Sequence, residues 1–157
     1  MKTILKLKSA VFLLLVSFVF TGCLNDLFEQ RDNRIAEDTQ QLTVFPTGKS
    51  TNEPAAGSGA TVTSTFNIEK VSREGAAVDA AYTVGGTAVS GTHYTIAQGS
   101  PVSMGDGTFV TTVTINVLDS PLASGESATV VINLQDSGIY TAAPNISTFT
   151  LTIFGAD

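Results

Sequence analysis

The chain has 157 residues, and its 8 Lys and Arg against 14 Asp and Glu give a formal net charge of −6 at pH 7. This balance argues against nucleic acid as a partner, because a phosphate backbone requires a positive protein surface. One histidine and one cysteine are too few for a zinc site built from such ligands. The length suits one domain of ordinary size with a short linker.

The first predicted element is a secretory signal peptide over residues 1–22. Lys2, Lys6 and Lys8 precede an apolar run over residues 11–20, VFLLLVSFVF. A basic segment, an apolar segment and small residues before a cleavage point are typical of such a peptide. The run falls short of the roughly 20 residues that a membrane-spanning helix needs. An uncleaved single-span anchor and a conventionally cleaved signal are the alternatives.

The run ends in Phe20-Thr21-Gly22-Cys23, which resembles the lipobox of bacterial lipoproteins. The resemblance implies lipidation of Cys23, with fatty acids such as palmitate, and cleavage immediately before it. Loss of the three lysines would leave 5 basic and 14 acidic residues, a formal charge of −9. We therefore expect membrane attachment through acyl chains rather than through charge, at the periplasmic or cell-surface face of the outer membrane.

Residues 23–40 are predicted to be the lipidated N-terminus and a linker, either partly helical or disordered. Charges of both signs are mixed there with a few apolar residues, without a convincing apolar stripe. Leu24 stands where proteobacterial lipoproteins retained in the inner membrane have aspartate. Asp26 and Glu29 resemble, poorly, the acidic export signal of Bacteroidetes surface lipoproteins.

From residue 41 to 157 the pattern predicts strands and no helix. A short strand over residues 42–45 is followed by a loop over residues 46–60, which is rich in proline, glycine and serine. Apolar residues then recur at every second position, as expected of half-buried strands. The alternating sets are Val62-Ser64-Phe66-Ile68, Val78-Ala80-Tyr82-Val84, Phe109-Val113-Ile115-Val117, Ala128-Val130-Ile132-Leu134 and Phe149-Leu151-Ile153.

About seven short strands separated by turn signals predict an all-β fold. The expected architecture is an immunoglobulin-like antiparallel sandwich of two sheets. The cysteine pair and the core tryptophan of antibody domains are both missing. The likeness is therefore to the architecture alone.

Residues 82–95, YTVGGTAVSGTHYT, resemble the "GTA…G.DYT" signature of Calx-beta domains. The other pieces follow in order: an early strand before Arg73 and Gly75, a turn at residues 105–108, and a late acidic stretch before the strand that ends at Leu134. Glycines 85, 86 and 91 suit turns that need a positive φ. Tyr94 is expected to bury its ring and to bond a backbone group through its hydroxyl.

The resemblance also implies a possible calcium site at one end of the sandwich. Asp119 and Glu126 match acidic positions of the family, and Glu53 aligns with an early glutamate. Ser120 replaces a second aspartate. Calcium takes 6–8 oxygen ligands, so these carboxylates predict a weak site at most, with a solvated acidic turn as the alternative.

The sequence indicates no catalysis. His93 is expected to be a structural turn residue, since no nucleophile and base pattern surrounds it. We expect a binding or structural module whose partner is an envelope protein or a glycan. One alternative is a glycan-binding accessory lipoprotein of a nutrient-uptake system, with Tyr140 as its exposed aromatic contact; another is a weakly calcium-binding adhesion module.

Overall fold

The structure is a computed structural model that describes residues 40–72 and 75–156. The signal peptide, Cys23 and most of the linker lie outside these residues, as does Arg73. The compact unit runs from Thr39 to Asp157. Its described part contains strands and no helix, which confirms the predicted all-β class.

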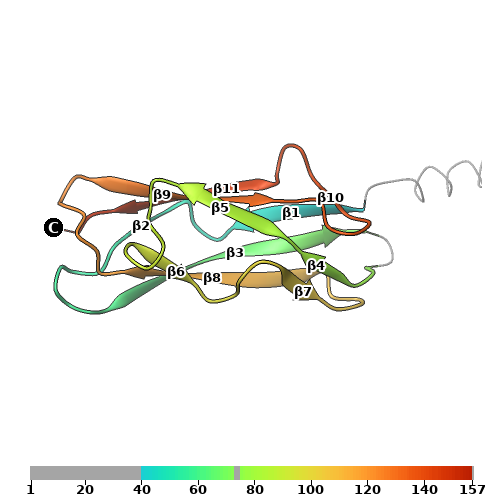
Figure 1. Ribbon diagram of the computed structural model, residues 1–157, viewed down its shortest axis with the longest axis horizontal. Coiled ribbons are helices and arrows are strands. Elements are labelled where there is room, and N and C mark those ends of the chain that lie inside the picture. Colours follow the sequence, from blue (N-terminus) through green and yellow to red (C-terminus); the bar gives the residue numbers. More distant parts are fainter. Residues whose placement is uncertain (1–39, 73–74, 157) are drawn as a thin grey trace, which may run out of the picture. The chain divides into compact units, whose positions relative to one another are not determined.

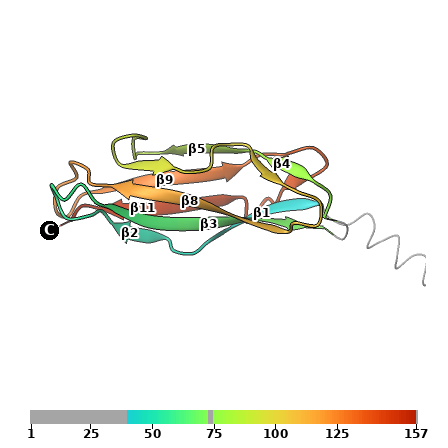
Figure 2. The same cartoon turned by 90° about the horizontal axis from the view of Figure 1, so that it is seen from below.

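The first sheet has five strands in the order β10–β1–β3–β8–β6. Its pairs are antiparallel except β1 with β10, which is parallel. Figure 2 shows β3 and β8 side by side at the centre of this sheet. The strands are β10 (Thr141–Ala142), β1 (Gln41–Pro46), β3 (Thr61–Val71), β8 (Val110–Leu118) and β6 (Tyr94–Ile96).

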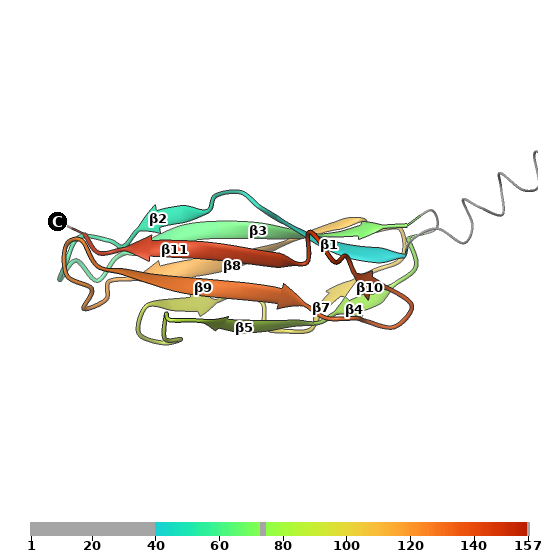
Figure 3. The same ribbon diagram turned by 90° about the horizontal axis from the view of Figure 1, so that it is seen from above.

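The second sheet has four strands in the order β2–β11–β9–β5, which Figure 3 shows from one edge to the other. The β2–β11 pair is parallel and the others are antiparallel. A separate two-stranded ladder joins β4 to β7. These strands are β2 (Ser50–Asn52), β11 (Thr148–Phe154), β9 (Ser127–Leu134), β5 (Tyr82–Gly86), β4 (Val78–Ala80) and β7 (Val102–Met104).

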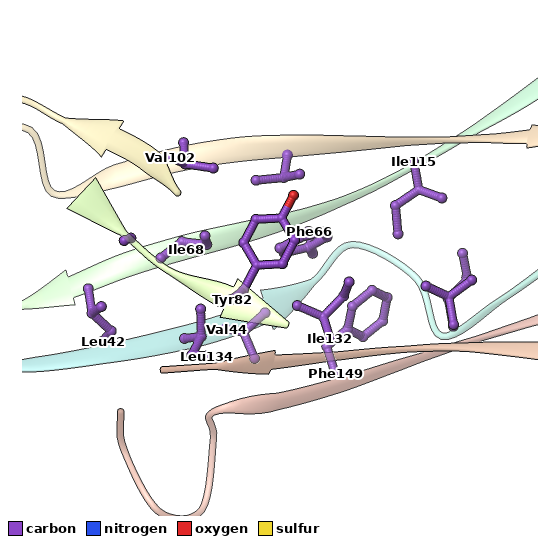
Figure 4. Close-up of a cluster of buried hydrophobic side chains, with 14 of the residues drawn as sticks. Leu42, Val44, Phe66, Ile68, Tyr82, Val102, Ile115, Ile132, Leu134 and Phe149 are labelled. Carbon is purple, nitrogen blue, oxygen red and sulfur yellow. The ribbon is translucent and has the colours of Figure 1, made fainter. Parts of the chain in front are cut away.

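The core lies between the two sheets and is formed by the alternating residues. Side chains of β3, β5 and β11 meet at its centre, where the Phe66 ring lies 5.9 Å edge-on from Tyr82 and 5.6 Å from Phe149 (Figure 4). Burial of each such side chain contributes about 1.5–3 kcal/mol to folding. The predicted core sets of β9 and β11 are buried without exception.

Several details differ from the sequence-based prediction. The described part of the chain has eleven strands instead of about seven. β6, β7 and β10 have only two or three residues each, and β2 lies within the predicted loop 46–60. The run that starts at Val78 divides at Ala81 between two sheets. Val84 is exposed, since β5 is an edge strand of its sheet and has only β9 as a neighbour there. Phe109 precedes β8 and is exposed as well.

The two ends of the sandwich carry different loops. Strand β3 runs along the sandwich between them (Figure 1). Loop 53–60 and the end of β11 lie at the end marked C, and β4 and β7 lie near the other end (Figure 1). We call these the C-terminal end and the β4–β7 end.

Candidate functional site

The predicted lipidation site, Cys23, lies outside the described residues. In the part of the chain that the structure describes, no helix is long and apolar enough to cross a membrane. The candidate sites among the described residues are therefore the two loop clusters and the sheet surfaces.

Glu53 is the most deeply buried of the predicted calcium ligands, with 4% of its surface exposed. It follows β2, and its main-chain N–H donates to the Phe154 carbonyl at 2.9 Å, which fixes it beside β11. Its carboxylate accepts a short hydrogen bond from the Ser120 hydroxyl and a second from the Ala156 N–H at 3.3 Å. Glu53 therefore joins the β8–β9 connection to the C-terminal segment.

Asp119 and Glu126 lie at the same end, and both use their carboxylates locally. Asp119 Oδ2 accepts from the Gly59 N–H at 2.9 Å and so closes loop 53–60 over the end of β8. Glu126 Oε2 accepts from the Ala123 N–H at 3.0 Å within the turn before β9. The Glu126 main chain is also bonded to Gly155 at 3.0 Å.

The three predicted ligands thus share one end of the sandwich, as the resemblance implies, but they serve different loops. Among the described residues, no three side chains of the types His, Cys, Asp and Glu are grouped closely enough to hold a metal ion. Calcium needs 6–8 oxygens on one point, and the carboxylates here accept hydrogen bonds from protein donors instead. The carboxylates at this end hold the loops in place by accepting their hydrogen bonds.

Tyr140 corrects the prediction of an exposed aromatic contact, because only 1% of its surface is exposed. A tight turn with reciprocal main-chain bonds to Ser137, at 2.8 and 3.0 Å, directs the ring inward. The hydroxyl then donates to the Ala76 carbonyl at 3.2 Å, across the β4–β7 end. Tyr140 is a core residue and not a ligand platform.

Lys70 is a buried ionic residue that the sequence analysis missed, with 4% of its surface exposed. Its ammonium donates to three main-chain carbonyls, those of Gly75 and Ala76 at 2.8 Å and that of Gly105 at 3.0 Å. The rings of Phe109 and Tyr140 each lie 6.0 Å from Nζ, within the range of a cation–π contact. The sequence does contain the signal, because Lys70 has the parity of the core-facing residues of β3.

The Calx-beta-like signature forms the connection from β5 to β6. Gly86 has a φ of +103°, and a Cβ there would lie 2.1 Å from the Thr129 carbonyl oxygen, so no other residue fits. The Ala88 N–H donates to that same oxygen at 2.9 Å. Gly91 also has a positive φ, whereas Gly85 does not.

His93 is engaged in this connection. Its ring Nδ1 accepts a hydrogen bond from the Val89 N–H at 2.9 Å, and its main-chain N–H donates to the Val89 carbonyl at 2.8 Å. A ring nitrogen used as an acceptor within one turn agrees with the predicted structural role.

Two tyrosines occupy the core behind the same connection. Tyr94 is buried, as predicted, and Tyr82 donates its hydroxyl proton to the Gln98 carbonyl. Burial raises the pKa of both phenols above the ordinary 10.0, and Tyr94 adds a further electrostatic increase to the pKa of Tyr82. Both side chains are therefore neutral core residues at physiological pH.

The sequence matches no protein-family profile and no curated protein. The fold, in contrast, is shared with solved structures. The structure of CBD12 from CALX1.2 has a TM-score of 0.58 at 18% identity, and the alignment covers 74% of this chain and 44% of that one. The apo-form Calx CBD1 domain gives 0.52 at 16% identity, with 74% and 99% covered.

A third structure, from Bacteroides ovatus ATCC 8483, is described as a candidate carbohydrate-binding protein. It gives a TM-score of 0.52 at 12% identity, with 71% of this chain and 36% of that one covered. This chain thus spans less than half of the CALX1.2 and Bacteroides proteins. At such identities the likeness concerns the fold alone, and the described domain is a Calx-beta-like β-sandwich.

Proposed function

We propose that this protein is a lipid-anchored, non-catalytic binding module of a bacterial outer membrane. The observation that carries the proposal is that the candidate metal-binding and catalytic side chains form hydrogen bonds within the protein. Glu53, Asp119, Glu126 and His93 all accept hydrogen bonds from protein donors within a sandwich of the kind found in binding domains. A scaffold in which these four groups are engaged by its own loops is suited to presenting a surface.

The anchoring part of the proposal is supported by the lipobox-like ending at Cys23. In a bacterial host, metabolic labelling with an alkyne analogue of palmitate should mark the wild type and an Asn25→Ala control. Cys23→Ser should lose the label and leave the membrane fraction. A Cys23→Ser protein that still incorporates the lipid would refute the anchoring mechanism.

The binding part is supported by the fold shared with a Bacteroides protein described as a candidate carbohydrate binder. We favour a glycan ligand over calcium, because Glu53, Asp119 and Glu126 are each bonded within separate loops. A glycan array probed with the detergent-solubilised full-length protein tests this directly. Retention of a defined glycan supports the proposal. A chain that binds no glycan but captures one envelope protein would replace the glycan with a protein partner.

A further inference from the structure

A cleft of about 390 Å³ opens at the seam where the chain crosses from one sheet to the other. Strand β1 belongs to the first sheet and β2 to the second, so the residues between them bridge the gap. The opposite wall is the turn that precedes β11 and the first residues of that strand. The volume lies within the range of small-ligand pockets, about 300–1,000 Å³.

The walls of this seam cleft are fixed by main-chain hydrogen bonds. The Thr47 N–H donates to the Thr65 carbonyl at 3.1 Å, and the Thr152 N–H donates to the Lys49 carbonyl at 3.0 Å. Across the cleft, the Val44 N–H donates to the Ile146 carbonyl at 2.8 Å. The crossing segment is therefore held on both sides, and the cleft is preformed.

The lining combines an apolar base with exposed apolar residues. Val44 and Phe149 are buried, whereas Phe45 and Ile146 are each 42% exposed. The Phe45 ring is thus available to cover one face of a ligand. An aromatic side chain beside a few polar groups is the common composition of a ligand site.

Three polar side chains of the lining are uncommitted. Lys49 Nζ, the Asn145 amide and the Thr150 hydroxyl have no hydrogen-bond or ion-pair partner within the described residues. Thr148, by contrast, donates to Asn133 Oδ1 at 3.0 Å. The cleft therefore offers one cation, one amide and one hydroxyl to an incoming molecule.

The charge of Lys49 is distinctive on this surface. Lys49 and Lys70 are the only lysines or arginines in the described ranges, and Lys70 is buried. The same ranges contain seven carboxylates, at residues 53, 69, 79, 106, 119, 126 and 136. The only exposed lysine of an acidic domain thus lies in a preformed cleft, and charge complementarity favours an anionic ligand.

The uncommitted groups of the cleft suit a sugar acid. β10 pairs with β1 only at residues 41–42, and β2 pairs with β11 only at residues 152–154, so the strand edges beside the cleft are not fully paired. A peptide would have to use these edges through its main chain. A sugar acid would instead use the cation, the amide and the hydroxyl of the side chains, and the peptide arm of the titration below distinguishes the two.

We propose that the seam cleft binds a uronic-acid residue of an acidic polysaccharide, an inference that rests on the binding role proposed above. Lys49 pairs with the sugar carboxylate, and Asn145 and Thr150 bond its hydroxyls. The Phe45 ring covers the C–H face of the sugar. This arrangement accounts for every uncommitted polar group of the cleft.

The test uses the detergent-solubilised full-length protein and titrates it with tetragalacturonate by calorimetry. The fully methyl-esterified tetramer keeps the rings and removes the charge. We expect at least about tenfold weaker binding of the ester, which corresponds to about 1.4 kcal/mol. Lys49→Gln and Phe45→Ala should weaken binding of the acid similarly, and Lys49→Arg should retain it.

Phe154→Ala is the matched control, because Phe154 is also 42% exposed but lies outside the cleft. Unchanged binding in this variant, with loss in Phe45→Ala, supports the assignment. Absence of tetragalacturonate binding by the wild type, equal affinity for acid and ester, or equal affinity of Lys49→Gln would overturn it. So would preferential binding of a peptide with a free C-terminal carboxylate.

Failure of the inference can be told apart from failure of the proposed function. If the array identifies a glycan whose binding ignores the Lys49 and Phe45 substitutions, the binding role stands and the seam cleft is wrong. If the protein retains no glycan at all, the glycan-binding role fails together with the inference.

Discussion

The two ends of the sandwich bury charges of opposite sign and hold them in different ways. Lys70 at the β4–β7 end and Glu53 at the C-terminal end are both 4% exposed. The Lys70 ammonium donates three hydrogen bonds, all of them to main-chain carbonyls. Glu53 receives one bond from the Ser120 hydroxyl and one, at 3.3 Å, from the Ala156 N–H.

This difference shows how many hydrogen-bond donors or acceptors each buried charge has left for a ligand. An ammonium has three donors, and those of Lys70 are all used. A carboxylate has about four acceptor sites, and only two bonds to Glu53 are present. The buried charge of the β4–β7 end is therefore saturated by the protein, whereas the buried charge of the C-terminal end keeps acceptor capacity.

The comparison is tested most strongly by Lys70→Met. The substitution keeps an apolar stem and removes the ammonium, so the carbonyls of Gly75, Ala76 and Gly105 lose their shared donor. We expect a loss of about 3 kcal/mol in the free energy of unfolding, because three charge-assisted hydrogen bonds are lost. Each carbonyl keeps one neutral donor, namely the Gly107 N–H, the Tyr140 hydroxyl or the Thr108 N–H. Urea unfolding followed by circular dichroism measures it.

Lys49→Met is the matched control, since the same substitution is made at an exposed lysine without a partner in the described residues. It should leave the unfolding midpoint unchanged. Equal midpoints for the two variants would show that the other donors satisfy the three carbonyls and that the buried ammonium adds no net stability.

Ser120→Ala tests the opposite end, where we expect a smaller loss of about 2 kcal/mol. The variant removes the hydroxyl that serves Glu53 and leaves the Ala156 N–H as its remaining donor. Ser103→Ala removes a comparable bond to Asp79 on the exposed surface and should cost much less. If both serine variants lose the same free energy, burial of Glu53 does not strengthen its bond.

Much of the fold was predictable because the strands have a regular period. The alternation in β3, β8, β9 and β11 places their core residues correctly, and Lys70 could have been found by extending the parity of Phe66 and Ile68. The short strands carry too few residues to show a period. β2 was hard to predict for a further reason, because its partner strand β11 lies about 100 residues further along the chain.

The candidate sites were less predictable because their contacts are long-range. Tyr140 reaches Ala76 over 64 residues, and Ser120 reaches Glu53 over 67. Nothing local to the segment SGIYTAAPN distinguishes an inward tyrosine from an outward one. The family resemblance placed three carboxylates at one end correctly, but their individual hydrogen bonds depend on loop paths that composition does not determine.

A neutral buried donor provides a reference for the two charged ends. Tyr82→Phe removes the hydrogen bond to the Gln98 carbonyl and should cost about 1 kcal/mol, less than either charged variant. Burial raises the pKa of Tyr82 above 10.0, so the folded state holds this proton longer than the unfolded state does. Stability should therefore be complete below pH 10 and fall as the pH rises through the raised pKa.

The measurement is the urea midpoint of wild type and Tyr82→Phe at neutral pH and about one pH unit above 10. The variant should lose less stability than the wild type between the two conditions, because one of the two buried phenols is gone. Parallel losses would mean that Tyr82 titrates equally in both states and that its burial carries no linkage.

The smallest expected effect is that of calcium at the C-terminal end. Glu53, Asp119 and Glu126 each accept bonds from protein donors, so an ion would have to compete with these donors for the carboxylate oxygens. Even a site with a millimolar Kd would add only about 0.4 kcal/mol when the calcium concentration equals that Kd. Thermal melts in calcium and in chelator should therefore nearly coincide, with magnesium as the control. A clear stabilisation that Asp119→Asn and Glu126→Gln both remove would show that the carboxylates of this end form a cation site. Only the C-terminal end would then be open to a ligand. The two ends would differ in function as well as in the hydrogen-bonding groups that their buried charges leave unused.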